Sequence, residues 1–398
     1  MAATSHDPIV IVGMARTAMG GFQGAFAPLT APQLGSAAIK SAVERAGTSP
    51  RDVSEVLMGC VLPAGQGQAP ARQAALGAGL PNSVPCTTVN KMCGSGMKTV
   101  MMAYEALHAR PTDIMVAGGM ESMTNAPYLL PKMRTGARLG HAEVKDHMFL
   151  DGLEDAYDKG RLMGTFAEEC AQSYQFTREA QDAFAIESLK RSKAANENGA
   201  FAKEIVPVAV KTRTGSVEVT QDEQPFTADP GKIPKLKPAF RDGGTVTAAN
   251  SSSISDGAAA LVLMRESEAK RRNLTPLAKI SGVASVAQAP ALFTTAPVGA
   301  VRKLLEAVGW SAKDVGLYEI NEAFAVVTMA AMRDLGVPHE KMNVHGGACA
   351  LGHPIGASGA RIIVTLLAAM EKYGESKGVA ALCIGGGEAT AVAVERIA

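Results

Sequence analysis

Two stretches of the chain read VERAGTSPRDV (Val43–Val53) and LEAVGWSAKDV (Leu305–Val315), and they align without a gap. Glu, Gly, Ser, Asp and Val occupy the same places in both. A second pair, AGGME at Ala117–Glu121 and IGGGE at Ile384–Glu388, matches at a similar separation. Two matches in the same order make coincidence in a Gly/Ala-rich chain the weaker explanation. The repeat therefore predicts two structurally similar halves.

Strand and helix signals alternate along the first half. The β-branched run Pro8–Gly13 predicts a buried strand, and Asp113–Ala117 predicts another that ends at a Gly-Gly pair. Between them, Thr30 and Gln33 form a capping-box signature at the start of a predicted helix, Ala31–Ala46. Such alternation predicts an α/β fold in which helices cover the faces of a parallel or mixed sheet.

The middle of the chain differs in character and predicts an inserted loop domain over residues 121–247. It is rich in proline and basic residues and contains a polar helix, Thr177–Asn198. Residues 248–273 return to an apolar, Ala-rich pattern and are expected to rejoin the first half. We therefore expect an N-terminal half made of residues 1–120 and 248–273, and a C-terminal half made of residues 274–398.

The composition favours no charged macromolecule as a partner. The formal net charge is +1, with 19% charged residues, so no bulk field attracts nucleic acid or an anionic membrane. No apolar run reaches the length that spans a bilayer. We therefore expect a small-molecule substrate, and no nucleic-acid or membrane partner.

Cysteine usage and the chain ends bear on metal binding and location. Six cysteines are too few for a disulfide scaffold, and none forms a C-x-x-C pair, so no metal site is expected. Met1–Pro8 lacks the features of a secretory signal, and Glu395–Ala398 is not a peroxisomal address. A reducing, cytoplasmic location is therefore expected.

Cys93 stands in NKMCGSG (Asn90–Gly96), where an extended stretch meets a predicted helix, Gly94–His108. A thiol there faces the positive end of the helix, which is expected to lower its pKa. The glycines allow a tight turn, and the free N–H groups of the first helical turn could hold an oxyanion. A structural role is the usual fate of a lone cysteine and suits Cys60 and Cys170. The Gly-Ser-Gly context of Cys93 favours a nucleophile instead.

Three further motifs are candidates for chemistry. His353 lies on a Gly- and Pro-fixed loop, and histidine is the usual base for a thiol; His345 is its rival but is better explained as a surface histidine or a hydrogen-bonded (satisfied) core histidine. Cys383 ends a predicted strand before three glycines, at the sheet edge where α/β proteins build their sites. The amide of Asn321, in NEAF, could fix a water or an oxyanion.

Taken together, these motifs resemble the thiolase family, in particular its acetyl-CoA acetyltransferase branch. They span the whole chain in the family's order: NKMCGSG at Cys93, VAGGMES at Val116–Ser122, NEAF at Asn321, GHPIGASG at His353 and CIGGG at Cys383. The resemblance implies a thiolase fold, with two α/β halves in a five-layered α-β-α-β-α core and a loop domain over the substrate. It also implies CoA and acetyl-CoA as substrates, with no permanently bound cofactor.

The resemblance assigns a role to each matching residue. It makes Cys93 the nucleophile that takes the acyl group and His353 the acceptor of its proton. With a water held by Asn321, His353 also faces the thioester oxygen of the second acyl-CoA. Cys383 removes the α-proton in synthesis and returns it in thiolysis. The backbone N–H groups of Cys93 and Gly385 form the other oxyanion hole.

The resemblance also implies contacts with CoA and its acyl group. Ser252 matches the family serine that contacts pantetheine. Arg213 matches a basic stretch at the nucleotide end of CoA, although a solvated charge on a hairpin explains it equally well. The remaining predicted contacts are Leu162, Met163, Phe293 and Phe324. Leu162 stands where short-chain members often have His, and Phe293 where some have Met, so strict four-carbon specificity does not follow.

The expected activity is the reversible condensation of two acetyl-CoA to acetoacetyl-CoA and CoA. A degradative 3-oxoacyl-CoA thiolase of broader chain length is the alternative within the family. A β-ketoacyl synthase would have His or Asn in place of Cys383, and a non-catalytic CoA- or lipid-binding module would lack part of the catalytic set. The stretch Pro127–Phe149 resembles the loop that joins dimers into tetramers, so a homo-oligomer, a tetramer in particular, is expected.

Overall fold

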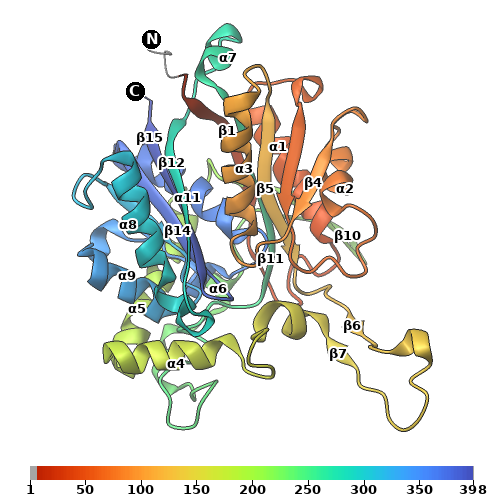
Figure 1. Cartoon of the computed structure of the whole chain (residues 1–398), viewed down its shortest axis with the longest axis vertical. Helices are drawn as coiled ribbons and strands as arrows, with labels where there is room; N and C mark the ends of the chain where they lie inside the picture. Colours follow the sequence, from red (N-terminus) through yellow and green to blue (C-terminus); the bar gives the residue numbers. More distant parts are fainter. Residues whose placement is uncertain (1–6, 398) are drawn as a thin grey trace.

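Two sheet segments of matching topology form the centre of the computed structural model, which describes residues 7–397 (Figure 1). The N-terminal segment has the order β4-β3-β5-β11-β1, and the C-terminal segment has the order β13-β14-β15-β12. In the N-terminal segment β3 and β5 run parallel, and β11 pairs antiparallel with both β5 and β1. In the C-terminal segment β13 and β14 run parallel, and β15 pairs antiparallel with both β14 and β12. The isolated parallel bridge between Tyr318 and Met342 takes the position in the C-terminal half that β4 takes in the N-terminal half.

The strands and helices of each half follow the same order. The N-terminal half contains β1 (Ile9–Thr17), α1 (Ala31–Arg45), β3 (Glu55–Gly59), α2 (Pro70–Gly77), β4 (Cys86–Val89), α3 (Ser95–Ala109), β5 (Met115–Ser122), β11 (Ser255–Arg265) and α7 (Glu266–Arg271). The C-terminal half contains β12 (Ala278–Ala287), α8 (Ala296–Val308), β13 (Leu317–Ile320), α9 (Ala325–Leu335), α10 (Ala348–Leu351), α11 (Ser358–Tyr373), β14 (Lys377–Ile384) and β15 (Glu388–Arg396).

The two faces of β11 show that the core has five layers. Ala258, Ala260 and Val262 pack into one hydrophobic cluster with α1 and α2, whereas Leu261 and Leu263 pack into a second cluster with α3 and α11. A third cluster lies between α8 and the opposite face of the C-terminal strands. Helices α3 and α11 therefore form a central layer between the two sheet segments. The predicted fold of two similar α/β halves is confirmed.

The end of β5 corrects one sequence-based prediction. The strand was expected to end at Ala117, yet it runs on through Gly118 and Gly119 to Ser122. A β-carbon at Gly118 would lie 2.1 Å from the Ala259 carbonyl oxygen, and one at Gly119 would lie 2.0 Å from the Gly356 carbonyl oxygen. These glycines thus mark close backbone approach inside a strand and not the end of the strand.

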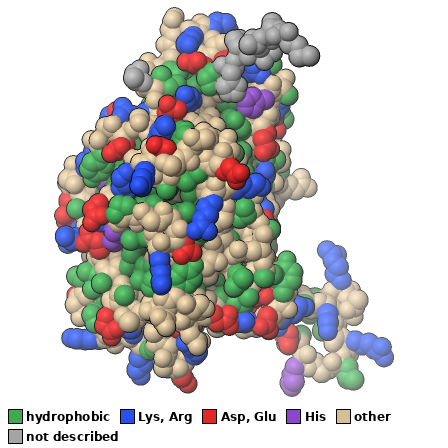
Figure 2. All heavy atoms as spheres, turned by 60° about the vertical axis from the view of Figure 1, so that its left-hand side comes forward, with side chains coloured by type: hydrophobic (Ala, Val, Ile, Leu, Met, Phe, Trp, Pro, Cys, Tyr) green, Lys and Arg blue, Asp and Glu red, His purple; other side chains and the backbone are tan. Residues whose placement is uncertain are grey.

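The segment between β5 and β11 covers one end of the core. It contains α4 (Met163–Tyr174), α5 (Arg178–Glu197), α6 (Gln224–Thr227), a π-helical turn (Phe149–Leu153), the short strand β8 (Ile205–Val206), and the hairpins β6–β7 (Tyr128–Leu129 and Lys145–Asp146) and β9–β10 (Val208–Thr212 and Gly215–Val219). The short strand β2 (Gly20–Gly21) precedes α1 and pairs with β11. The β6–β7 arm projects from the body and carries several basic side chains (Figures 1 and 2). The expected domain boundaries at residues 120, 247 and 273 stay predictions.

A buried ionic network joins this middle segment to the N-terminal half. The guanidinium of Arg16, on β1, contacts Glu204 at 2.6 Å and Asp222 at 2.7 Å, and all three side chains are fully buried. The two carboxylates hold the charge of Arg16 where no water can solvate it. The network therefore fixes how the middle segment sits on β1.

Two expectations concern the chain ends and membranes. The predicted absence of a secretory signal concerns Met1–Pro8, most of which lies outside the described residues. Ala398, the last residue of the tetrapeptide predicted not to be a peroxisomal address, lies outside them as well. Among residues 7–397, none of the helices has the length and apolar run needed to cross a bilayer.

Candidate active site

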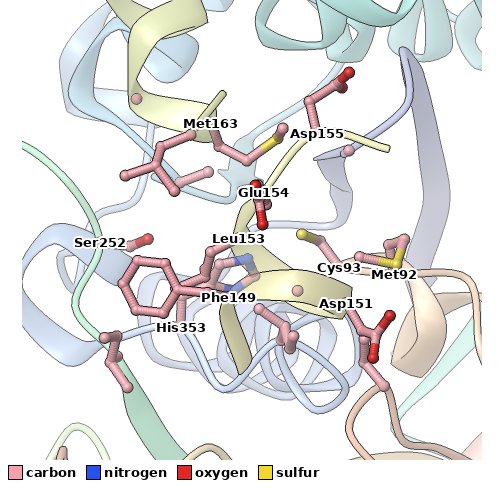
Figure 3. A pocket seen from close by; sticks show the side chains of 18 of the residues that line it. Met92, Cys93, Phe149, Asp151, Leu153, Glu154, Asp155, Met163, Ser252 and His353 are labelled. Atoms are coloured by element: carbon pink, nitrogen blue, oxygen red, sulfur yellow. The ribbon is translucent and has the colours of Figure 1, made fainter. Parts of the chain in front are cut away.

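A cavity of about 880 Å³ lies where the two halves and the middle segment meet. Cys93, His353, Cys383 and Gly385 all line it, so loops from both halves contribute to one space. Figure 3 shows the Cys93 sulfur pointing toward the side of the cavity where the His353 ring lies, with Met163 and Ser252 on its walls. The volume suits an extended small molecule bound among apolar walls with a few polar groups.

The turn before α3 presents Cys93 to the cavity. Met92 has a φ of +46°, a left-handed conformation that non-glycine residues seldom adopt. The buried hydroxyl of Ser95 stabilises this turn, accepting from the Lys91 N–H at 2.8 Å and donating to the Met92 carbonyl at 2.6 Å. Gly94 lets the turn approach the C-terminal half, since a β-carbon there would lie 2.4 Å from Ile384 Cδ1. The strained turn thus aims the sulfur across the junction of the halves.

The surroundings of the Cys93 sulfur correct the predicted direction of its pKa shift. Burial raises the pKa of the Cys93 thiol to about 11, while hydrogen bonds from the Gly385 and Cys93 backbone N–H groups act to lower it. The expected lowering by the helix start is therefore outweighed by loss of solvation. The same two N–H groups are the ones predicted to form an oxyanion hole, and they converge on the sulfur from opposite halves.

We predict that alkylation of free Cys93 by iodoacetamide accelerates steadily with pH up to about pH 10 without levelling off near neutrality. The reason is that a thiol with a pKa of about 11 stays protonated and uncharged below that pH, and only the thiolate reacts. Peptide mass spectrometry after timed alkylation measures the rate at Cys93 alone. A plateau reached below pH 8 would contradict this account and indicate a preformed thiolate.

The ring of His353 is oriented by its neighbour Ser358, at the start of α11. Its Nδ1 lies 2.5 Å from the Ser358 hydroxyl oxygen, and that hydroxyl donates to the Pro354 carbonyl at 3.0 Å. Because the hydroxyl proton is used there, Nδ1 donates to Ser358, which leaves Nε2 as a free acceptor. Burial and the charge of Arg361 lower the pKa of His353 to about 3, so the ring is uncharged at neutral pH.

The rival histidine lies elsewhere. His345 is buried in the core, packs its ring against Phe201 and Tyr373, and does not line the cavity. Burial lowers its pKa to about 4. The structure therefore confirms that His345 is a core histidine. It is not the satisfied one that was expected, because within residues 7–397 neither ring nitrogen has a hydrogen-bond partner.

Asn321 directly follows β13 and does not line the cavity, although Ala323 and Phe324 on the same segment do. Its backbone N–H donates to Ala381 at 3.0 Å, and its side chain is 1% exposed. In the described part of the chain neither amide atom of this side chain is hydrogen-bonded, so both can bind another polar group. The neighbouring Glu322 fixes this segment by accepting from Ser188 at 2.7 Å and Asn343 at 2.9 Å.

Cys383 is the penultimate residue of β14, lines the cavity and is 1% exposed. Burial raises the pKa of its thiol well above the usual range, and the proximity of Cys93 raises it further. Phe293 and Phe324 pack in the same apolar cluster. A protonated thiol in such a place can exchange a proton with carbon once a substrate is bound. Among residues 7–397 no three His, Cys, Asp or Glu side chains are grouped as a metal site.

The predicted CoA contacts divide into two groups. The residues that line the cavity are Leu162, Met163, Ser252, Phe293 and Phe324. Ser252 is placed there because its N–H donates to the Ala323 carbonyl at 2.9 Å. Arg213 lies at the exposed turn of the β9–β10 hairpin and does not line the cavity, so its contact with a nucleotide stays a prediction.

Two residues that support the site were missed from the sequence. Ser358, which orients His353, and Glu121, whose carboxylate is buried between the halves, both lie inside motifs noted above but were given no role. A polar residue at the start of a helix five positions after a candidate base could have indicated Ser358. No local signal indicates Glu121, because its partners are distant in sequence.

Comparison with known proteins assigns the chain to a family. Residues 9–267 match the model of the thiolase N-terminal domain, and residues 274–396 match that of the thiolase C-terminal domain. Acetyl-CoA acetyltransferase 2 of Arabidopsis thaliana is 52% identical, over 99% of this chain and 100% of its own length. The acetyl-CoA acetyltransferase of Schizosaccharomyces pombe is 49% identical, over 98% of this chain and 100% of its own length. That of Cupriavidus necator is 50% identical, over 98% of this chain and 99% of its own length. The chain therefore belongs to the thiolase family.

Proposed function

We propose that the chain is an acetyl-CoA C-acetyltransferase, which condenses two acetyl-CoA reversibly to acetoacetyl-CoA and CoA. The observation that carries the proposal is the meeting of Cys93, Cys383, His353 and the Gly385 N–H in one cavity. A second thiol beside the nucleophile suits chemistry at carbon, which a simple thioesterase does not need. The names of the relatives, at about half identity over nearly the whole chain, support the same activity.

The first half-reaction transfers an acetyl group to Cys93. The sulfur attacks the thioester carbon of acetyl-CoA as His353 Nε2 takes its proton. The developing oxyanion occupies the space in front of the Cys93 and Gly385 N–H groups, which are already oriented. Collapse of the intermediate breaks the bond to CoA, whose sulfur receives the proton back from His353. The products are acetyl-Cys93 and free CoA.

The second half-reaction forms the carbon–carbon bond. Cys383 passes its proton to His353 and, as the thiolate, removes a proton from the methyl carbon of a second acetyl-CoA, and the resulting carbanion attacks the acetyl-Cys93 carbonyl. The thioester oxygen of that acetyl-CoA faces His353 and a water held by the amide of Asn321, which stabilise the enolate charge. Breaking the bond to Cys93 releases acetoacetyl-CoA, the Cys93 sulfur takes back the proton held by His353, and thiolysis follows the same path in reverse. The two half-reactions give ping-pong kinetics.

Acyl chain length is the first property to test. We predict that thiolysis with saturating CoA is fast for acetoacetyl-CoA. For a 3-oxoacyl-CoA longer by several carbons, kcat/KM is expected to be at least tenfold lower, which corresponds to about 1.4 kcal/mol. The reason is that the buried Phe293 and Phe324 rings close the cavity beside Cys383. Initial rates are compared side by side, with the 2-methyl form of acetoacetyl-CoA included.

The outcomes separate the alternatives. Comparable turnover of the longer substrate would contradict the proposal and indicate a degradative thiolase, with Leu162 as the residue to examine. Turnover of the 2-methyl form alongside acetoacetyl-CoA would leave the reaction as proposed and make Phe293 a wall that admits one branch. Absence of turnover for every substrate would indicate a binding module.

The proposal extends to assembly and location. We place the pantetheine arm of CoA along Ser252 and Met163. We also propose that the enzyme holds no permanently bound cofactor. The β6–β7 arm exposes Tyr128, Leu130, Met133 and Leu139, and such an apolar surface suits contact with another copy of the chain. A homotetramer in the cytoplasm, built through this arm, is the assembly we propose.

A further inference from the structure

Glu121 is a fully buried carboxylate that joins the two halves beside the candidate active site. It lies near the end of β5, in the N-terminal half. Its carboxylate accepts from the Val61 and Leu62 N–H groups at 2.9 and 3.2 Å, both on the loop that follows β3. It also accepts from the Gly356 N–H at 2.9 Å, in the C-terminal half. One carboxylate therefore hydrogen-bonds to backbone groups of both halves.

The Gly356 contact lies three residues after His353, on the same loop. This loop docks into a notch lined by glycines of the N-terminal half. A β-carbon at Gly119, Gly59 or Gly96 would lie 2.0, 2.7 or 2.9 Å, respectively, from the Gly356 carbonyl oxygen. The loop that carries His353 can therefore reach Glu121 because no side chain stands between them.

The loop that contains Val61 also contacts the turn that carries Cys93. The Cys60 N–H donates to the Val89 carbonyl at 3.0 Å, and the Asn90 amide reaches the Val61 carbonyl at 3.5 Å. Asn90 begins the turn that presents Cys93 and caps it by accepting from the Met92 N–H at 3.0 Å. Val61 also belongs to the same buried apolar cluster as Ile355, the residue between Pro354 and Gly356. A continuous path of contacts thus runs from Cys93 through Glu121 to His353.

We propose that Glu121 is a positioning residue, which holds the His353 loop of one half at the correct distance from the Cys93 turn of the other. The inference rests on the proposed function, because it assumes that His353 takes the proton of Cys93. A neutral amide cannot replace the carboxylate. Glutamine has one acceptor oxygen, and its NH₂ group would face N–H donors that the carboxylate now accepts.

The test compares Glu121→Gln with the wild-type enzyme in thiolysis of acetoacetyl-CoA. We expect kcat to fall about 100-fold, since displacement of a catalytic group by about 1 Å costs this much. KM is expected to change much less than kcat, because Glu121 is hydrogen-bonded to the loops that carry Val61 and Gly356 and not to Ser252 or Met163. Glu121→Asp keeps the charge but is too short to reach both loops, so it is expected to lose about tenfold in kcat.

A second readout separates positioning from general destabilisation. Acetylation of Cys93 by acetyl-CoA, followed by mass spectrometry, requires the base and is expected to slow as kcat does. Alkylation of Cys93 by iodoacetamide at pH 10 depends much less on the base, so it is expected to keep at least its wild-type rate. Removal of the Glu121 charge lowers the pKa of the Cys93 thiol, and this change also favours faster alkylation.

The matched control is Glu268→Gln. Glu268, on α7, is 3% exposed and accepts hydrogen bonds from Arg271 and from Arg272, the residue after the helix, at the end of β11 away from the cavity. This variant is expected to lower the melting temperature and to leave kcat unchanged per folded molecule. If Glu121→Gln does not fold, the aspartate variant decides the question by the same readouts.

The inference is overturned if folded Glu121 variants keep the wild-type kcat, or if acetylation and high-pH alkylation slow together. A fall in kcat that the folded fraction accounts for overturns it as well. Failure of the proposed function has a different signature, since the wild-type enzyme itself would then neither cleave acetoacetyl-CoA nor acquire an acetyl group on Cys93.

Discussion

Replacement of Cys93 by alanine is expected to abolish acyl transfer, lowering kcat by about 10⁴-fold or more. The sulfur is the atom that receives the acetyl group in the proposed reaction, and the other thiol in the cavity cannot replace it. The Gly385 and Cys93 N–H groups converge on the Cys93 sulfur and not on Cys383. Thiolysis of acetoacetyl-CoA by Cys93→Ala, compared with wild type at equal folded concentration, gives the measurement.

The fold should survive this change. The Cys93 side chain faces the cavity and packs only at the edge of two apolar clusters, so its truncation removes few contacts. Cys349→Ala is the matched control, because Cys349 lies near the same loops but does not line the cavity. It is expected to keep wild-type turnover. Substantial acyl transfer by Cys93→Ala would remove the basis of the proposed mechanism.

Replacement of Cys383 by alanine is expected to separate the two half-reactions. Loss of a general acid and base lowers rates by about 10²- to 10⁴-fold, and the whole loss should fall on the step at carbon. Acetylation of Cys93 by acetyl-CoA needs only Cys93, His353 and the two N–H groups, so it should proceed at nearly the wild-type rate. Rapid-quench mass spectrometry measures acetylation, and a condensation assay measures the overall rate.

The assignment of Cys383 has a clear contrary result. A Cys383→Ala enzyme that condenses acetyl-CoA normally would show that another group moves the α-proton. An enzyme that fails to acetylate Cys93 would show that Cys383 acts in the first half-reaction. Cys383→Ser is a useful companion variant, since it replaces the thiol with a hydroxyl of similar size that is far less acidic.

The fold could be predicted from the sequence largely because the chain repeats. Matching stretches at Val43–Val53 and Leu305–Val315 fall at the ends of α1 and α8 and lead into β3 and β13 in the two halves. The continuation of β5 through Gly118 and Gly119 could not be predicted in the same way. Its cause is contact with Ala259 and Gly356, which are distant in sequence, whereas glycine pairs by themselves suggest that a strand ends.

The candidate site was predictable where a short motif carries its own chemistry. Cys93, His353 and Cys383 each stand beside glycines, and the structure brings all three to one cavity. The pKa of Cys93 was not predictable, because the helix start is visible in the sequence and the burial of the sulfur is not. Glu121 was missed for a related reason, since its hydrogen-bond partners come from the β3 loop and from the His353 loop.

The central claim is that acetyl-CoA alone converts Cys93 to its thioester. Incubation of the wild-type enzyme with acetyl-CoA, rapid acid quenching and peptide mass spectrometry test it directly, since each cysteine is followed separately. The account predicts one acetyl group on the peptide that contains Cys93, none on the Cys383 peptide, and loss of the label with formation of acetyl-CoA when CoA is added. Acetylation of Cys383 in place of Cys93, or turnover without any acetylated cysteine, would contradict it.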